Sequence, residues 1–118
     1  MDKPHKKLKV WKQGIEIVEE IYRITRNFPG EERFGLVSQM RRCAVSIPSN
    51  IAEGSARNGN NEFRNFLHIA QASLSELDTQ LEITLRLGYI KIEAHNEIDK
   101  RLNETDKMLS GLIRSLKK

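Results

Sequence analysis

A helical pattern that runs through a proline constrains this chain most. Between residues 37 and 51, apolar side chains recur every three or four positions, the spacing of one helix face. They are Val37, Met40, Ala44, Ile47 and Ile51. Pro48 lies inside this pattern, where a proline removes a backbone hydrogen bond, clashes with the preceding turn and costs about 3 kcal/mol. We therefore expect a helix that is kinked at Pro48 and held by tight packing against other helices.

Three further segments show the same spacing, so that the helix through Pro48 is the second of four. The first of the four carries one apolar row formed by Trp11, Ile15, Val18, Tyr22 and Thr25, and a second row formed by Ile17, Ile21, Ile24 and Phe28. The third segment carries Phe63, Leu67, Ala70, Leu74, Leu77, Leu81 and Thr84, and the fourth carries Ile98, Leu102, Thr105, Leu109, Leu112 and Leu116. These rows predict four helices, each with a face for a shared core.

Glycines and prolines predict where the helices end. Pro29-Gly30 should end the first helix, and Gly54 should be a left-handed cap at or near the end of the second. The polar turn 57–61 supplies candidate N-caps for the third helix. Gly88 should stop that helix, with residues 89–90 packing back over its end.

The connections between these segments are short, so sequential helices should be antiparallel neighbours. No stretch shows strand-like alternation. We predict an all-α, up-and-down four-helix bundle in a single domain over residues 1–118, with residues 1–7 as a flexible basic tail. The first and third helices carry further apolar residues beside the main row, which on the third helix are Phe66, Ile69 and Leu85. This second row favours a further buried face and hence a homo-oligomer. A wide core stripe would explain part of the same pattern.

The formal net charge is +4, and the whole excess lies at the N-terminus. Residues 1–12 hold five lysines against Asp2, whereas the acidic and basic side chains of residues 13–118 cancel. The lysines are Lys3, Lys6, Lys7, Lys9 and Lys12. Such a segment is either a nucleic-acid-binding arm or a solvated terminus.

A second basic cluster is expected on the second helix and the turn after it. Residues 33–64 hold five arginines and only two acids, Glu53 and Glu62. The arginines are Arg33, Arg41, Arg42, Arg57 and Arg64. Guanidinium groups suit phosphates, but they also suit bidentate pairs with carboxylates such as Glu76, Asp78 or Glu82, within or between subunits. Both interpretations stay open.

Polar residues gather on one face beside the proline. Ser46, Asn50 and Glu53 are spaced by four and three. Pro48 leaves the carbonyl of Ala44 without its usual donor, which the Asn50 amide could replace. The face is either a buried network that sets helix register or a polar pocket for a ligand.

The sequence carries no recognisable motif for several kinds of active site or membrane segment. The three histidines are far apart and no Glu-x-x-His motif is present, so we expect no metal site and no cofactor. Cys43 has no histidine near it and should be a small packed residue. No serine has a base at a readable spacing. No apolar run reaches the roughly 20 residues that cross a bilayer. We expect a cytoplasmic protein that is not an enzyme and does not enter a membrane.

Motifs along nearly the whole chain resemble those of a bacterial family of four-helix-bundle proteins. They include Phe34-Gly35-Leu36, Arg41-Arg42, the run Ser46-Ile47-Pro48 with Asn50-Ile51-Ala52-Glu53-Gly54, Thr79-Gln80-Leu81 and Leu87-Gly88-Tyr89. This family includes proteins encoded by intervening sequences in large-subunit ribosomal RNA genes. The resemblance implies a subunit of a ring-like homopentamer without enzymatic activity. It extends to the accessory variability protein of diversity-generating retroelements, a basic pentameric barrel that binds nucleic acid and a reverse transcriptase.

Together these observations predict an oligomer that binds RNA or DNA weakly and without sequence preference. The basic residues expected to make these contacts are Lys3, Lys6, Lys7, Lys9, Lys12, Arg41, Arg42, Arg57 and Arg64. The alternative is a protein-interaction scaffold, with an unidentified protein partner, whose arginines serve subunit pairing.

Overall fold

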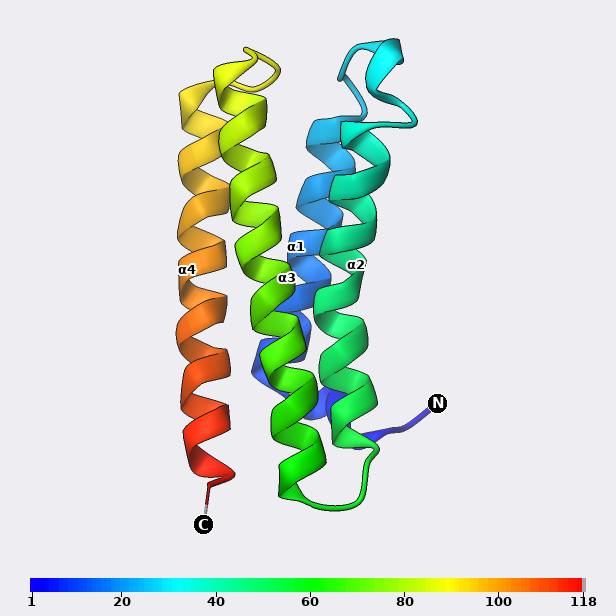
Figure 1. The fold of residues 1–118 in the computed structure, drawn as a ribbon, viewed down its shortest axis with the longest axis vertical. Helices are drawn as coiled ribbons and strands as arrows, with labels where there is room; N and C mark the ends of the chain where they lie inside the picture. The colour runs from blue at the N-terminus through cyan, green and yellow to red at the C-terminus, as the bar shows by residue number, and fades with distance from the viewer. Residues whose placement is uncertain (118) are drawn as a thin grey trace.

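The computed structural model describes residues 1–117, and all of its regular structure is helical (Figure 1). A 3-10 turn η1 (Pro4–Lys7) leads into α1 (Lys9–Thr25), and a second 3-10 turn η2 (Gly30–Glu32) precedes α2 (Leu36–Ser55). Helices α3 (Asn60–Arg86) and α4 (Ile92–Ser115) complete the chain.

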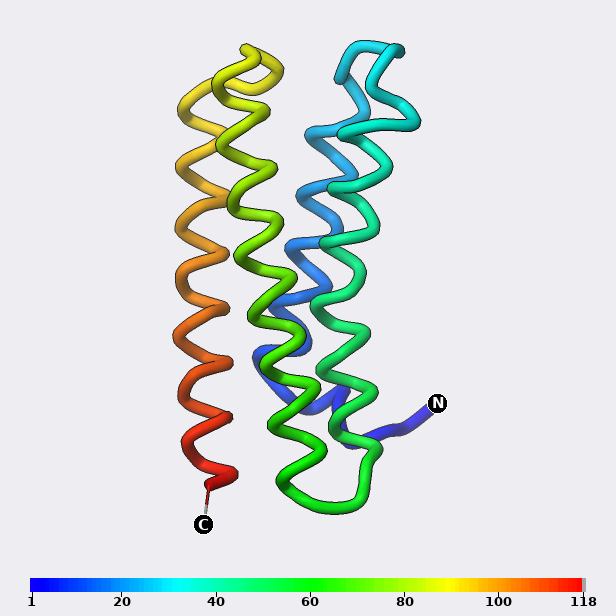
Figure 2. The backbone as a smooth tube through the Cα atoms, viewed as in Figure 1, coloured from blue at the N-terminus to red at the C-terminus, as the bar shows by residue number. Residues whose placement is uncertain are grey.

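The four helices lie side by side with alternating direction, which the tube in Figure 2 traces from end to end. Each helix packs against its neighbours in sequence, and α4 closes the arrangement by packing against α1. The molecule measures 46 × 25 × 20 Å. The prediction of an all-helical, four-helix fold is confirmed; the ring-like assembly stays a prediction.

The predicted core faces of α2 and α3 are confirmed. All five apolar residues predicted for α2 are buried, as are six of the seven predicted for α3, with Phe63 partly buried. In α1, however, the row that we expected to be additional is the one that faces the core. Ile17 and Ile21 are fully buried, whereas Ile15 and Tyr22 are 36% and 37% exposed. Most of the row of Trp11, Ile15, Val18 and Tyr22 therefore lies toward the surface, with Trp11 and Val18 partly buried against the core. Thr25, the last residue predicted for that row, is buried.

Pro48 lies inside a continuous α2 and is buried. Its ring contacts α1 at Gly14, where a Cβ atom would lie 3.2 Å from the Pro48 Cβ. A glycine on the facing helix therefore makes room for the proline ring. The predicted bend of the helix axis at Pro48 stays a prediction.

Helix α1 ends at Thr25, three residues before the expected end at Phe28. Phe28 precedes a proline, and the residue before a proline is disfavoured in helical geometry. It leaves the helix and is buried with its ring centroid 5.2 Å from that of Tyr89.

Gly88 ends α3 as predicted, at φ +76°. The Gly88 amide donates to Leu85 at 3.0 Å and the Tyr89 amide donates to Thr84 at 2.9 Å, which is the paired hydrogen-bond pattern of a Schellman motif. The prediction of a left-handed cap at Gly54 is wrong. Gly54 lies within α2, and the only positive-φ glycines among residues 1–117 are Gly59 and Gly88.

The expected N-terminal tail includes η1, which packs against α1 and α2. The His5 and Trp11 rings lie 5.1 Å apart. Flexibility of residues 1–7 stays a prediction. Among residues 1–117, no helix combines the length and apolar character that crossing a lipid bilayer requires.

Candidate functional site

The N-terminal lysines lie at one end of the bundle. Figure 1 shows that the start of α1, the α2–α3 turn and the end of α4 all lie at this end. Lys3, Lys6, Lys7, Lys9 and Lys12 are all exposed there. Lys6 Nζ donates to the carbonyl of Met1 at 2.6 Å, a local contact that leaves the ammonium group in solvent.

Two of the predicted arginines lie at the same end. Arg64 Nη1 donates to the Leu116 carbonyl at 3.0 Å, so it joins the start of α3 to the end of α4. Arg57 forms an ion pair with Glu53 at 2.8 Å and lies over the Phe66 ring at 5.0 Å. We call residues 1–12, 53–64 and 111–117 the basic end. It holds nine basic side chains and three acidic ones, which leaves +6, more than the net charge of the whole chain.

Arg41 and Arg42 lie toward the opposite end of α2. Arg42 lies thirteen residues, or about 20 Å at the helical rise, before the end of α2 at Ser55, and Arg57 follows that end. Arg41 is held against α1, where its Nε donates to Thr25 Oγ1 at 3.0 Å and its guanidinium lies 4.4 Å from the Tyr22 ring centroid. Arg42 is exposed. The structure thus divides the predicted nucleic-acid-binding residues between two distant surfaces.

Around Arg41 and Arg42, aromatic and basic side chains share one surface between α1 and α2. We call the surface formed by Tyr22, Arg33, Phe34, Arg41, Arg42 and Val45 the aromatic–arginine face; it borders a shallow groove of about 480 Å³. Phe34 is 88% exposed, and the Arg33 guanidinium lies 5.4 Å from its ring centroid. Phe34 was not among the predicted site residues. Its position in a turn, outside every predicted apolar row, could have indicated an exposed aromatic side chain.

The polar face of α2 packs against α3. The Ser46 and Ser73 hydroxyls are hydrogen-bonded to each other, and the Asn50 amide donates to the Ser46 carbonyl at 2.7 Å. The structure assigns Asn50 this carbonyl, not that of Ala44. Glu53 points elsewhere, to its pair with Arg57. The hydrogen bond between Ser46 and Ser73 joins α2 to α3, as a register-setting network would, whereas the Asn50 hydrogen bond lies within α2.

Cys43 belongs to the same contact between α2 and α3. The thiol is buried and donates to the Ser73 carbonyl at 3.0 Å. Burial, reinforced by the negative charge of Glu76, raises the pKa of Cys43 to about 12. A thiol in this state is a poor nucleophile at neutral pH, which agrees with a packing role.

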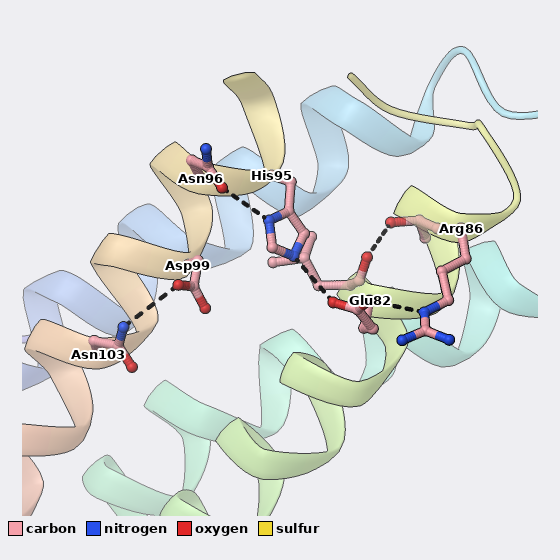
Figure 3. A network of polar contacts seen from close by, with 8 residues as sticks. Glu82, Arg86, His95, Asn96, Asp99 and Asn103 are labelled. Atoms are coloured by element: carbon pink, nitrogen blue, oxygen red, sulfur yellow. Dashed lines mark hydrogen bonds and ion pairs between the residues drawn. The ribbon is translucent and has the colours of Figure 1, made fainter. Parts of the chain in front are cut away.

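A further set of polar contacts joins α3 to α4 near the turn between them (Figure 3). Glu82 accepts from Arg86 Nε at 2.9 Å and lies 3.7 Å from His95 Nε2. The hydrogen bond from Arg86, followed by the charges of Arg86 and His95, lowers the pKa of Glu82. Among residues 1–117, no three histidine, cysteine or acidic side chains are grouped as metal ligands.

The fold and surface describe a small four-helix-bundle protein with a strongly basic end and a separate aromatic–arginine face. The model of the 23S rRNA-intervening sequence protein family matches residues 6–111. The chain therefore belongs to the 23S rRNA-intervening sequence protein family.

A solved structure from Bacteroides thetaiotaomicron supports the same assignment. It is described as a protein with unknown function from the S23 ribosomal protein family. The two chains superpose with a TM-score of 0.82 and are 27% identical, over 89% of this chain and 95% of the other. No curated protein matches the chain.

Proposed function

We propose that this protein binds RNA or DNA through the phosphate backbone, weakly and without sequence preference, and that the basic end is the contact surface. The observation that carries the proposal is the +6 excess at one end of the bundle, drawn together from three separate parts of the chain. Lysine and arginine side chains that neutralise phosphates release counterions, which supplies most of the free energy of nonspecific binding.

The side chains available at this end favour phosphate contacts over base contacts. Its tryptophan, Trp11, is partly buried against His5, and its phenylalanine, Phe63, is also partly buried. Phe66, next to this end, lies under Arg57. Single-strand binding surfaces need aromatic rings on which bases can stack. Structured RNA and duplex DNA, which present their backbones outward, are therefore the better candidates.

Membership in a family named for intervening sequences of 23S rRNA is compatible with an RNA partner but does not identify one. Self-association would strengthen the binding, because several basic ends on one assembly act together. In a homopentamer, the oligomer that the family resemblance implies, five N-terminal segments would bring about twenty positive charges. The protein on this proposal is a non-enzymatic oligomer, cytoplasmic, with itself and nucleic acid as partners.

Fluorescence anisotropy with labelled structured RNA and duplex DNA, at several salt concentrations, tests the proposal. The variant Lys3→Gln/Lys6→Gln/Lys7→Gln should bind more weakly than the unaltered protein. For duplex DNA, the slope of log K against log salt should become shallower by up to about 0.9 per lost phosphate contact. A matched control, Lys91→Gln/Lys100→Gln/Lys107→Gln, removes the same charge from exposed sites outside the basic end and should retain the original slope.

Two outcomes would overturn the proposal. One is no binding even at low salt. The other is equal loss in both triple variants, which would mean that net charge alone, and not the basic end, determines affinity.

A second candidate function is a protein-interaction scaffold in which the arginines serve subunit pairing. The specific observation that favours it is the aromatic–arginine face, because exposed aromatic side chains next to arginines are enriched in protein interfaces. Phe34, at 88% exposure, is the most exposed aromatic side chain among residues 1–117. Replacement of Phe34 by serine should weaken self-association if this candidate is correct.

A further inference from the structure

The surface between α3 and α4 is the electrostatic opposite of the aromatic–arginine face. We call the groove lined by Asp78, Asp99 and Asp106, with Leu74 and Leu102, the acidic groove; its other lining residues are Ser75 and Asn103. The lining thus contains three carboxylates and no basic side chain. The groove along the aromatic–arginine face is lined by three arginines and no acidic side chain.

The charges on both surfaces lack an oppositely charged partner within the described subunit. Among residues 1–117, the three aspartates form no salt bridge with a lysine or arginine. Asp99 accepts only from the Asn103 amide, at 3.5 Å (Figure 3), and Asp106 accepts from Gln71 at 3.3 Å.

The arginines are in the same situation. Arg33, Arg41 and Arg42 form no salt bridge in this part of the chain. Elsewhere on the bundle, arginines do find carboxylates: Arg101, for example, lies 3.0 Å from Glu16. The two surfaces therefore present charges of opposite sign, three on each, that form no salt bridge among residues 1–117.

The two surfaces also lie at similar levels along the bundle. Arg42 is six residues, or about 9 Å, from the start of α2. Asp78 is eight residues, or about 12 Å, from the end of α3, and Asp99 is seven residues, or about 10 Å, from the start of α4. These three helix ends lie at the same end of the molecule in Figure 1. Copies placed side by side can therefore bring the two surfaces together without sliding along the bundle axis.

We propose that the aromatic–arginine face of one copy docks on the acidic groove of the next copy. This inference deepens the second candidate function, and it rests on self-association of the chain. Arg33 and Arg42 would face the aspartates, and Phe34 would be buried between the two copies. Such a contact joins two different surfaces, so it repeats head to tail and closes into a ring when the rotation between copies permits.

Charge reversal on each surface separately gives a sharp test. One variant carries Arg33→Glu with Arg42→Glu, and the other carries Asp78→Lys with Asp99→Lys. Arg41 is left unaltered because it also holds Thr25 and Tyr22 within the subunit. The control, Lys100→Glu with Lys107→Glu, reverses two exposed charges outside both surfaces and outside the basic end.

Sedimentation velocity at low and physiological salt gives the mass of each assembly, and circular dichroism checks the helical fold. The unaltered protein and the control should sediment as multiples of the 13.6 kDa subunit. Each charge-reversal variant should sediment as a single subunit. An equimolar mixture of the two variants should assemble again, because the intact groove of the first meets the intact face of the second and the two reversed surfaces also match.

Restored assembly in the mixture is the outcome that only this pairing of surfaces predicts. A single-subunit mass for the unaltered protein, undiminished assembly of either variant, or a mixture that does not assemble would each overturn the inference.

Measuring RNA binding by the same variants distinguishes this inference from the proposed nucleic-acid function. If RNA binds the basic end while the unaltered protein is a single subunit, this inference fails and the proposed nucleic-acid function stands. If Arg33→Glu/Arg42→Glu abolishes RNA binding without changing the assembled mass, the aromatic–arginine face serves nucleic acid instead of a second copy.

Discussion

Gly54 and Phe66 bring α2 and α3 closer together than any side chain at position 54 would allow. A Cβ atom built on Gly54 would lie 2.7 Å from the Phe66 Cβ and 2.9 Å from Cδ1 of Phe63. Helix α2 therefore needs glycine here for space and not for a left-handed cap. The close approach occurs where α2 ends and α3 begins, which is also where the basic end is assembled.

Replacement of Gly54 by alanine should destabilise the protein. Overpacking costs about 1–3 kcal/mol, which exceeds the gain of up to about 1 kcal/mol in helix propensity. We expect a net loss of about 1–2 kcal/mol in the free energy of unfolding, measured by urea denaturation. Gly111→Ala is the matched control, because the nearest atom there is the end of the Arg114 side chain at 3.9 Å. That variant should be slightly more stable than the unaltered protein, and equal stability of both variants would refute the steric explanation.

The Cys43 thiol should react slowly in the native protein. A pKa raised from 9.0 to about 12 lowers the thiolate fraction at pH 8 by about a thousandfold. Reaction with Ellman's reagent should therefore be slow at pH 8 and become fast when urea unfolds the chain. Reaction of the folded protein at the rate of the unfolded chain would show that the thiol is neither buried nor hydrogen-bonded to the Ser73 carbonyl.

Tyr89 should titrate above the ordinary tyrosine range. Its hydroxyl donates to Glu32 Oε2 at 2.8 Å, and this hydrogen bond is the main cause that raises the pKa of Tyr89. Because the folded pKa exceeds the unfolded value, the stabilisation is complete below about pH 10 and is lost as the pH rises through the folded pKa. In a Tyr22→Phe background, ultraviolet absorbance reports Tyr89 alone.

In that background, Glu32→Gln should lower the pKa of Tyr89 toward its ordinary value. Glu93→Gln, on the exposed first turn of α4, should leave the titration curve unchanged. An ordinary Tyr89 titration before the Glu32 substitution would contradict the hydrogen bond between the η2 segment and the α3–α4 turn.

Glu82 should stabilise the fold at neutral pH but not in acid. Its pKa is lowered, first by the hydrogen bond from Arg86 and then by the charges of Arg86 and His95. Stability from such a group is present above the unfolded pKa near 4.5 and is lost as the pH falls through the lower folded pKa.

The variant Glu82→Gln should therefore unfold at lower urea concentration than the unaltered protein at pH 7, and the difference should disappear in strong acid. Glu104→Gln, an exposed position on α4, serves as the control and should show little difference at either pH. A Glu82→Gln difference that does not change with pH would assign the effect to packing and not to charge.

Much of the fold could be predicted from the chain, and the misses have specific physical causes. The α3 row from Leu67 to Thr84 is buried as expected, and it keeps its spacing of four and three without a break, whereas the neighbouring Ile69 and Ile83 are exposed. In α1, two apolar rows run side by side, so spacing alone does not decide which row turns inward. In the structure, the inward row is the one that includes Gly14, the glycine against which Pro48 of α2 packs.

The candidate sites were less predictable than the fold. The N-terminal lysines lie within ten residues of one another in the sequence, so their shared location could be predicted. Arg42 and Arg57 look like one cluster in the chain, but about 20 Å of continuous helix lies between Arg42 and the end of α2, beyond which Arg57 follows. The acidic groove was not foreseen, because Asp78 and Asp99 come from different helices and share no local pattern.

The sequence by itself determined the helices, most of their core faces and the excess of charge near the N-terminus, because helical periodicity and composition act over a few residues at a time. Only the tertiary structure decided that Gly54 and Gly14 are sites of close helix approach, that Arg41 is held against Tyr22 and Thr25, and that charges of opposite sign gather on separate surfaces. These features depend on distances between residues that are remote in the chain, and those distances are set by how the four helices pack.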